Sequence, residues 1–453
     1  MKTVCAISTP LAVGGISVIR ISGDKAIEIA SKIFQPLSCE SVESMSGYTC
    51  CFGRIVSNGE IIDEGILTIF RSPKSYTGED VVEISCHGGI YVTKRVLRAA
   101  VESGAEPAAA GEFSKRAFLN GKLSLTQAEA VMDLISAQGE QTRRSALSVR
   151  EGALFSQIRE ITTRLVHILG ELAAWVDYPE EDLPDIQPDI LREDITNCIE
   201  ILQRLSNGYD KGRLFREGID TVITGKPNVG KSTLMNLLLG FERSIVTDIA
   251  GTTRDVVEES VRIGDVILRL SDTAGIRQTD DTVEAVGVKL AYKRLEEAML
   301  IIAVFDNSAV LSDEDKEIIH RVKNRHCIAV INKSDLEQKL ETDEISNSFE
   351  RVVEICAKNA EGLIKLEQAV SDIFRLNDID AFTGIISNER QKSCVSKSLS
   401  SLTAALEALV AGETYDAVTV MIDEAANSLL ELSGEKATEA VVSEVFSKFC
   451  VGK

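Results

Sequence analysis

The spacing of apolar residues along the chain changes near residue 120. Before this point, short alternating runs such as 15–23 and 65–70 are separated by Gly turns, and this pattern predicts an α+β domain. From Leu123 to Leu205, long segments rich in Ala, Leu, Ile, Glu and Arg have helical periodicity, with a break at 178–185. The second region is therefore predicted to be helical.

Strands and helices alternate from about residue 217 to 375, which is the pattern of a parallel sheet, and a second helical stretch covers about 385–449. Because the ends of a compact domain often lie close together, the α/β unit can be inserted into a helical domain. We therefore expect a multidomain α/β and α protein. Its segments are an α+β N-terminal domain at 1–118, a helical domain in two parts at 119–215 and 379–453, and an inserted α/β domain at 216–378.

Composition and charge narrow the class of protein. With 44% hydrophobic and 26% charged residues, the 453-residue chain is typical of a soluble globular protein of several domains. Its formal net charge of −21 disfavours unselective binding to nucleic-acid backbones, so such a partner would need a local basic patch or a helper subunit. Ten cysteines without CxxC pairs, and no secretory signal, predict reduced cytosolic thiols, and no apolar run approaches the length of a membrane span.

The segment from Gly225 to Ser232 completes the pattern G-x-x-x-x-G-K-[ST] directly after the β-branched run 219–224. Its glycines let backbone N–H groups converge on phosphate oxygens, Lys231 adds a positive charge, and the Ser232 hydroxyl is placed for magnesium. Asn228 stands at a variable position, where it is either an oxygen ligand for a monovalent cation or a spectator. The pattern predicts a nucleoside triphosphate site that includes Asn228, Val229, Gly230, Lys231, Ser232 and Thr233.

A second motif, Asn-Lys-Ser-Asp at 332–335, follows the apolar strand 327–331 and selects the base. Asp335 can accept hydrogen bonds from both N1–H and N2–H of guanine, whereas adenine offers no such pair. A wrong base would leave buried acceptors unsatisfied, at a cost of roughly several kcal/mol. A Cys-Ala-Lys turn follows at a distance that suits the back of the base, with Cys where Ser is usual. The guanine contacts are therefore predicted to be Asn332, Lys333, Asp335, Cys356, Ala357 and Lys358.

Two further segments bear on hydrolysis. Asp272 follows the strand 266–270 and offers a carboxylate for magnesium, and Gly275 has an N–H group that can meet the γ-phosphate. Ile276 stands where the Ras pattern has a water-positioning Gln, and an apolar side chain cannot orient water. Upstream, a segment rich in hydroxyls and carbonyls contains Thr253 as the natural second magnesium ligand. The predicted GTP contacts here are Thr247, Asp248, Ile249, Ala250, Gly251, Thr252, Thr253, Asp272, Thr273, Ala274 and Gly275.

Other distinctive segments lie outside these motifs, at 75–80, 87–89, 111–114, 116–122 and the terminal Phe-Cys-Val-Gly-Lys. With them, the chain resembles the tRNA-modifying GTPase family known as MnmE or TrmE, essentially from end to end. The resemblance implies an inserted Ras-like P-loop GTPase domain whose copies pair across a homodimer, with potassium in place of an arginine finger. The potassium ligands that it implies are Asn228, Thr247, Ile249 and Thr252.

The resemblance also implies roles for residues that are otherwise unremarkable charges. Glu284 matches a glutamate that orients the attacking water, although Ala285 stands where the family often has a basic residue. Cys450 lies in a C-x-G-K tail that faces a folate site in the family, where the thiol is a candidate nucleophile; the tail does not fit a prenylation box. The N-terminal domain resembles folate-binding modules, and the implied tetrahydrofolate contacts are Arg20, Glu83, Lys122 and Lys453.

The implied reaction is modification of the wobble uridine of tRNA at C5 with aminomethyl or carboxymethylaminomethyl groups, in the cytoplasm. It requires a flavoprotein partner, MnmG or GidA, which carries FAD, uses NADH and forms a heterotetramer with the GTPase. This chain has no dinucleotide fingerprint, in agreement with a flavin held elsewhere. A basic helical series is either a surface for tRNA or the partner, or a solvated helix face: Arg143, Arg144, Arg150, Arg159 and Arg164.

Two alternative functions remain at this point. A ribosome-assembly or signalling GTPase of the same class is expected to carry a basic RNA-binding appendage, whereas this chain has a folate-like N-terminal domain and a C-x-G-K tail. A non-catalytic scaffold that binds GTP only for affinity would not need Glu284. Both features favour the modification enzyme.

Overall fold

The computed structural model describes residues 2–137, 139–177, 187–241, 259–264, 266–271, 293–323, 325–374 and 384–453. The chain folds as two compact units. The first contains Met1–Met132, Val149–Ile199 and Cys394–Lys453, and the second contains Asp133–Ser148 and Glu200–Ser393. The boundaries between the four predicted segments stay a prediction.

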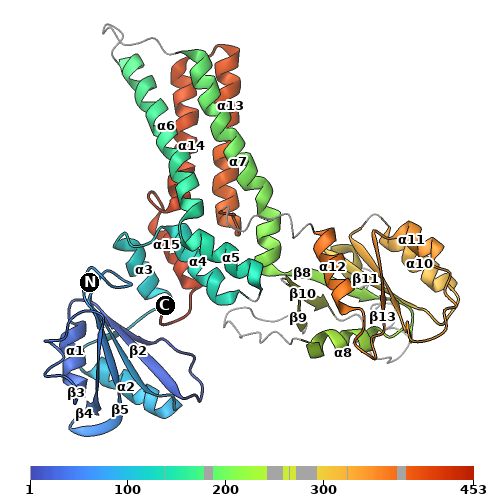
Figure 1. Cartoon of the computed structure of the whole chain (residues 1–453). Coiled ribbons are helices and arrows are strands. Elements are labelled where there is room, and N and C mark those ends of the chain that lie inside the picture. Colours follow the sequence, from blue (N-terminus) through green and yellow to red (C-terminus); the bar gives the residue numbers. More distant parts are fainter. Residues whose placement is uncertain are drawn as a thin grey trace, which may run out of the picture. The chain divides into compact units, whose positions relative to one another are not determined.

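The N-terminal part of the first unit is a seven-stranded sheet in the order β3-β4-β5-β6-β2-β1-β7 (Figure 1). Only β1 and β7 pair in parallel, and the other neighbours are antiparallel. The strands are β1 (Val4–Ile7), β2 (Ile16–Ser22), β3 (Phe34–Pro36), β4 (Thr49–Ser57), β5 (Glu60–Phe70), β6 (Val81–His87) and β7 (Glu106–Pro107).

Two helices, α1 (Ala26–Ile33) and α2 (Ile90–Glu102), cover this sheet because their apolar residues recur at helical spacing. Ile29 of α1 and Val96 of α2 join the same buried core as Ile19 and Ile84 of the sheet. This pattern of alternating strands with helices on a core face is the α+β architecture that the short apolar runs predicted.

The remainder of the first unit is helical. It contains α3 (Glu112–Leu119), α4 (Leu125–Ser136), α6 (Ala153–Asp177), α14 (Tyr415–Ser433), α15 (Glu439–Ser447) and parts of α7 (Pro188–Glu217) and α13 (Glu389–Ala411). Helices α6 and α14 lie side by side (Figure 1), and Trp175 meets Tyr415 edge to face at a ring distance of 5.2 Å. Segments on both sides of the α/β insertion therefore share one helical bundle.

Among the described helices, α13 alone has the length and hydropathy that a membrane span requires, with a mean hydropathy of 1.2. Helix α13 meets this criterion by length and composition only, and a core helix of a globular protein meets it equally well. The expectation that no segment spans a membrane stays a prediction.

The second unit is built on a six-stranded sheet in the order β13-β12-β11-β8-β10-β9, parallel except for β9. Its strands are β8 (Ile219–Thr224), β9 (Glu259–Ile263), β10 (Val266–Ser271), β11 (Leu300–Asp306), β12 (Cys327–Asn332) and β13 (Arg351–Ile355). Its helices include α5 (Glu140–Arg150), α8 (Lys231–Phe241), α10 (Asp313–Val322), α11 (Asp343–Ser348) and α12 (Leu363–Ile373). Two apolar cores fill its interior, and the central strands β11 and β12, which are covered on both faces, are almost wholly hydrophobic. The predicted fold class is confirmed.

One pair of cysteines departs from the expectation of reduced thiols. Cys39, after β3, and Cys51, in β4, form a disulfide, with their Cα atoms 6.0 Å apart. The antiparallel pairing of β3 with β4 brings these two positions together. The spacing of the two cysteines along the sequence does not predict this disulfide. The other eight cysteines form no disulfide among the described residues.

Candidate functional site

The phosphate loop joins the carboxyl end of β8 to the amino end of α8, where helical N–H groups are available to an anion. Gly225 has φ of +152° and Gly230 has φ of +100°, a region that favours glycine. A Cβ atom on Gly230 would also collide with the side chain of Asn332. Ser232 and Thr233 are exposed in the first turn of α8.

The Lys231 ammonium is held by the loop itself. Its Nζ donates to the carbonyl oxygens of Gly225 and Lys226, at 2.7 Å each. Burial lowers the pKa of Lys231. The positive charge of Lys231 therefore lies inside the loop, directed by two backbone carbonyls.

Asn332 joins the phosphate loop to the turn that follows β13. Its buried side chain donates from Nδ2 to the carbonyl of Val229 at 2.9 Å and accepts the Ala357 N–H at Oδ1, at 3.0 Å. A single amide thus uses both its donor and its acceptor between two loops. Asn332 acts as a structural joint of the site.

Lys333 has φ of +63° and directs its ammonium back to the phosphate loop. Its Nζ donates to the Asn228 carbonyl at 2.9 Å and pairs with Asp306 at the carboxyl end of β11. Burial opposes ionisation of Asp306, but hydrogen bonds from Lys333 and Ser308 outweigh it, so the pKa of Asp306 is lowered. Sequence reasoning missed Asp306; the available signal was an acidic residue that ends a buried strand.

The residues assigned to the base lie at the same edge of the sheet. Asp335 is exposed, and its Oδ1 accepts the thiol hydrogen of buried Cys356 at 3.2 Å. The Cys356 thiol therefore donates to Asp335 at the position where a Ser hydroxyl is usual. Ala357 is buried under its bond to Asn332, and Lys358 is exposed. The carboxyl ends of β8, β12 and β13 bring these residues beside the phosphate loop.

Several predicted site residues lie outside the described residues. They include both segments between the phosphate loop and β11 that were assigned to magnesium, potassium and the attacking water. These residues are Thr247, Asp248, Ile249, Ala250, Gly251, Thr252, Thr253, Asp272, Thr273, Ala274, Gly275 and Glu284.

A different cluster lies on the N-terminal sheet, where Arg20 of β2 is the register partner of Glu83 of β6. Their ion pair measures 2.7 Å, and Arg20 also donates from Nη1 to the Gly452 carbonyl at 3.2 Å. The guanidinium lies over the rings of Tyr76 and Phe113, with centroids 5.8 and 5.5 Å away. A cation, a carboxylate and two aromatic rings therefore meet the C-terminal tail.

The C-terminal tail packs against the N-terminal part of the chain. The Lys453 carbonyl accepts the Phe113 N–H at 3.2 Å, and the Cys450 carbonyl accepts the Gly111 N–H at 3.3 Å. Burial, followed by the charges of Arg20 and Arg150, lowers the pKa of Lys453. Cys450 itself is exposed. The structure thus brings Arg20, Glu83 and Lys453 together.

Lys122, the fourth predicted folate contact, is exposed and donates from Nζ to the Pro73 carbonyl at 3.0 Å. Pro73 lies in the loop between β5 and β6, and the same loop contains Tyr76, whose ring lies against the Arg20 guanidinium. A buried network that sequence reasoning missed supports this loop, because Arg116 pairs with Glu79 at 2.9 Å while only 3% of Arg116 is exposed.

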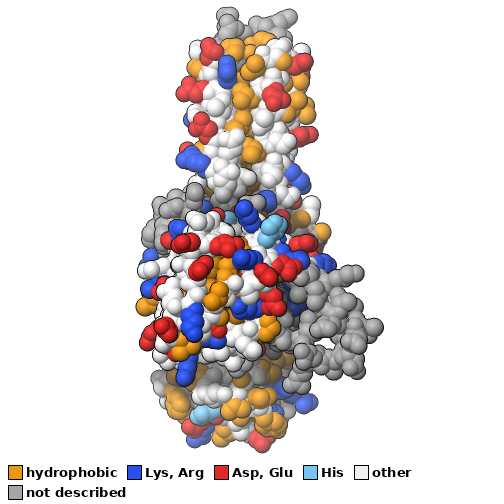
Figure 2. All heavy atoms as spheres, turned by 90° about the vertical axis from the view of Figure 1, so that its right-hand side faces the viewer, with side chains coloured by type: hydrophobic (Ala, Val, Ile, Leu, Met, Phe, Trp, Pro, Cys, Tyr) orange, Lys and Arg blue, Asp and Glu red, His pale blue; other side chains and the backbone are white. Residues whose placement is uncertain are grey.

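The basic helical series is partly neutralised by its neighbours. Arg143 and Arg144 both pair with Glu140 at 2.8 Å, and Arg164 pairs with Asp194 at 3.4 Å. On the face that Figure 2 presents, acidic and basic side chains are intermingled. A role for this series in binding tRNA or a partner stays a prediction.

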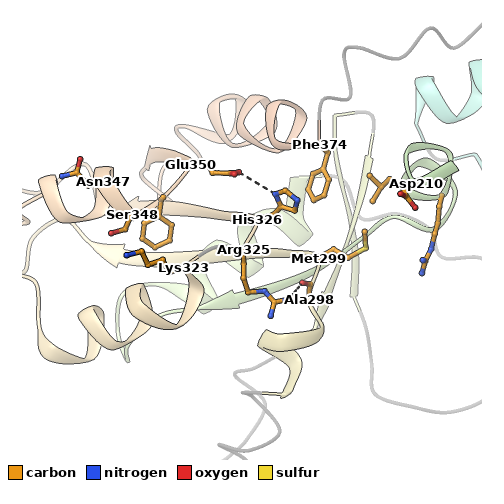
Figure 3. A pocket seen from close by; sticks show the side chains of 13 residues that line it. Asp210, Ala298, Met299, Lys323, Arg325, His326, Asn347, Ser348, Glu350 and Phe374 are labelled. Atoms are coloured by element: carbon orange, nitrogen blue, oxygen red, sulfur yellow. Dashed lines mark hydrogen bonds and ion pairs between the residues drawn. The ribbon is translucent and has the colours of Figure 1, made fainter. Parts of the chain in front are cut away.

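A hollow of about 830 Å³ lies at the amino ends of β11 and β12 (Figure 3). His326 lies there between Glu350, 3.7 Å from its Nδ1, and the ring of Phe374. Its lining contains none of the residues assigned to GTP. The phosphate loop follows the opposite, carboxyl end of the parallel strands, so this hollow is separate from the nucleotide site.

The fold and the loop geometry of the second unit define the protein as a P-loop GTPase with an added N-terminal α+β domain and a helical domain. Residues 125–450 match the model of the MnmE helical domain, and residues 3–122 match that of the GTP-binding protein TrmE N-terminus. The chain belongs to the tRNA modification GTPase MnmE family.

Full-length relatives support this membership. The tRNA modification GTPase MnmE of Acetivibrio thermocellus is 40% identical over 456 residues, covering 100% of this chain and 99% of the relative. That of Clostridioides difficile is 41% identical over 454 residues, with coverage of 100% and 99%.

Solved structures resemble only part of the chain. Era in complex with MgGDPNP and nucleotides 1506-1542 of 16S ribosomal RNA is 29% identical, covering 40% of this chain and 66% of Era, with a TM-score of 0.27. The G domain of the T. maritima FeoB iron transporter is 21% identical, covering 34% and 98%, also with a TM-score of 0.27.

Proposed function

We propose that this GTPase couples GTP hydrolysis to modification of tRNA at C5 of the wobble uridine. In this proposal a tetrahydrofolate derivative supplies the one-carbon unit, and a flavoprotein partner, MnmG or GidA, supplies FAD and NADH chemistry within a cytoplasmic heterotetramer. The product carries an aminomethyl or carboxymethylaminomethyl group. Family membership supports the tRNA substrate, and the cluster around Arg20 is the observation that carries the folate assignment.

The chemistry of this cluster fits a folate. Arg20 and Lys453 offer positive charge to the anionic glutamyl group, and Glu83 can accept hydrogen bonds from pterin N–H groups. The rings of Tyr76 and of the fully buried Phe113 pack against the guanidinium and hold it in place. Cys450 is exposed in the adjoining tail, and its thiol is the proposed nucleophile.

An Arg20→Met variant is expected to bind 5-formyltetrahydrofolate about tenfold or more weakly, because it loses charge-assisted hydrogen bonds. Calorimetric titration of the full chain measures this change. Arg98→Met is the matched control, since Arg98 is an exposed arginine of the same domain that pairs with Glu102. Equal binding by the Arg20 variant, at an unchanged melting temperature, would exclude the assignment.

For hydrolysis we propose that the G domains pair in a homodimer and use potassium where other GTPases use an arginine finger. Asn228 supports this proposal because it has φ of +64°, its carbonyl is held by Lys333, and its side chain is exposed at the loop. The proposed potassium ligands are completed by Thr247, Ile249 and Thr252, and magnesium would be held by Ser232 and Thr253.

GTP hydrolysis is expected to be at least about tenfold faster in potassium chloride than in sodium chloride at equal ionic strength, because sodium is too small to reproduce the charge placement. Phosphate release measures the rate, and GTP affinity in both salts is the control. An Asn228→Ala variant should lose most of the difference. Equal rates in the two salts would rule out the alkali-ion mechanism.

A further inference from the structure

Lys226, the second residue of the phosphate loop, makes a largely buried ion pair that the loop pattern does not require. Its Nζ lies 2.6 Å from Oδ2 of Asp315 and 3.2 Å from the Ser312 hydroxyl. The Lys226 side chain is 18% exposed and that of Asp315 only 2%. Position 226 is variable in the motif, and the loop pattern assigns it no role.

The acceptor of this ion pair is firmly held. Ser312 caps α10, and Oδ2 of Asp315 also accepts the Ser312 N–H at 2.9 Å and its hydroxyl at 2.8 Å, in a capping box. The other carboxylate oxygen, Oδ1, is buried without a hydrogen-bond partner among the described residues. Among the described residues, Lys226 is the cation that pairs with this carboxylate, whose side chain is only 2% exposed. Loss of Lys226 would therefore leave a buried charge uncompensated.

The same residue also directs the lysine that binds phosphate. The Lys226 carbonyl accepts from Nζ of Lys231 at 2.7 Å, as does the Gly225 carbonyl. The side chain of Lys226 is thus anchored to α10 while its backbone holds Lys231. Movement of residue 226 would move the acceptor that orients the Lys231 ammonium.

We propose that Lys226 is a positioning residue for nucleotide binding, which acts through its ion pair with Asp315 to fix the carbonyl that orients Lys231. The lysine of a phosphate loop reaches the β- and γ-phosphates. Loss of the anchor therefore weakens the binding of GDP as well as GTP, because both carry a β-phosphate. The base contacts at Asp335 are unaffected.

The test is calorimetric titration of the full-length protein with GDP and with a non-hydrolysable GTP analogue. Lys226→Met is expected to raise the dissociation constant of both ligands about tenfold, and Asp315→Asn to do the same. Because the two side chains act as one unit, the double variant should be no weaker than the worse single variant. Lys226→Arg, which keeps the charge, should recover affinity to within about threefold.

Arg269→Met is the matched control, because Arg269 pairs with Asp220 at 2.7 Å on the same sheet and touches no residue of the phosphate loop. It should leave both dissociation constants unchanged. Unchanged affinity of Lys226→Met would overturn the proposal, even if its melting temperature fell, as would a double variant near a hundredfold weaker. If Lys226→Met does not fold, Lys226→Gln takes its place under the same criteria.

Discussion

An Asp335→Asn variant is expected to bind GTP at least about a hundredfold more weakly and to prefer xanthosine triphosphate. In the proposed site the Asp335 carboxylate would accept two N–H groups of guanine, whereas an amide would present its own N–H group to one of them. Xanthine replaces that guanine donor with an oxygen, which an amide can meet. Titration of both proteins with both nucleotides measures the exchange of preference.

The position of Asp335 makes this prediction specific. Its carboxylate is exposed, and its Oδ1 accepts a hydrogen bond from the Cys356 thiol at 3.2 Å. Asp343→Asn removes an exposed carboxylate at the start of α11 in the same unit and is the control for charge alone. GTP binding that survives the Asp335 change undiminished would show that the base is recognised elsewhere.

A Glu284→Ala variant is expected to lose GTP turnover by at least about a hundredfold while it binds GTP normally. Hydrolysis requires an oriented water, and Ile276 cannot supply the hydrogen bond that a Gln would give. The family resemblance assigns this task to Glu284. Single-turnover phosphate release and GTP titration separate the chemical step from binding.

Glu297→Ala provides a comparison for this variant, because Glu297 is an exposed carboxylate that pairs only weakly with Lys293, at 3.6 Å. It should hydrolyse GTP at the rate of the unchanged protein. Normal turnover by Glu284→Ala would exclude Glu284 from the mechanism. A different residue would then have to position the attacking water.

Local patterns predicted the fold class and the described part of the GTP site. The phosphate loop needs only consecutive backbone groups and two glycines, so eight adjacent residues carry its signal. The turn at Cys356 was predicted from its distance along the chain, and it follows β13, whose parallel neighbour β12 leads into the Asn-Lys-Ser-Asp motif. Apolar runs of these strands predicted the sheet itself.

Contacts between residues far apart in sequence escaped prediction. Lys226 and Asp315 are 89 residues apart, and Lys333 and Asp306 are 27 apart. Each of these charges alone resembles a solvated surface residue, and only the fold brings the pairs together. The disulfide between Cys39 and Cys51 was missed for the same reason, because strand pairing creates it.

Mass spectrometry of nucleosides from total tRNA, after deletion of the gene, tests the central claim most directly. The proposed function predicts that C5 substituents disappear from wobble uridines, return with the unchanged protein and do not return with Glu284→Ala. Wobble uridines that keep their full set of C5 substituents in the deletion strain would contradict the proposed function.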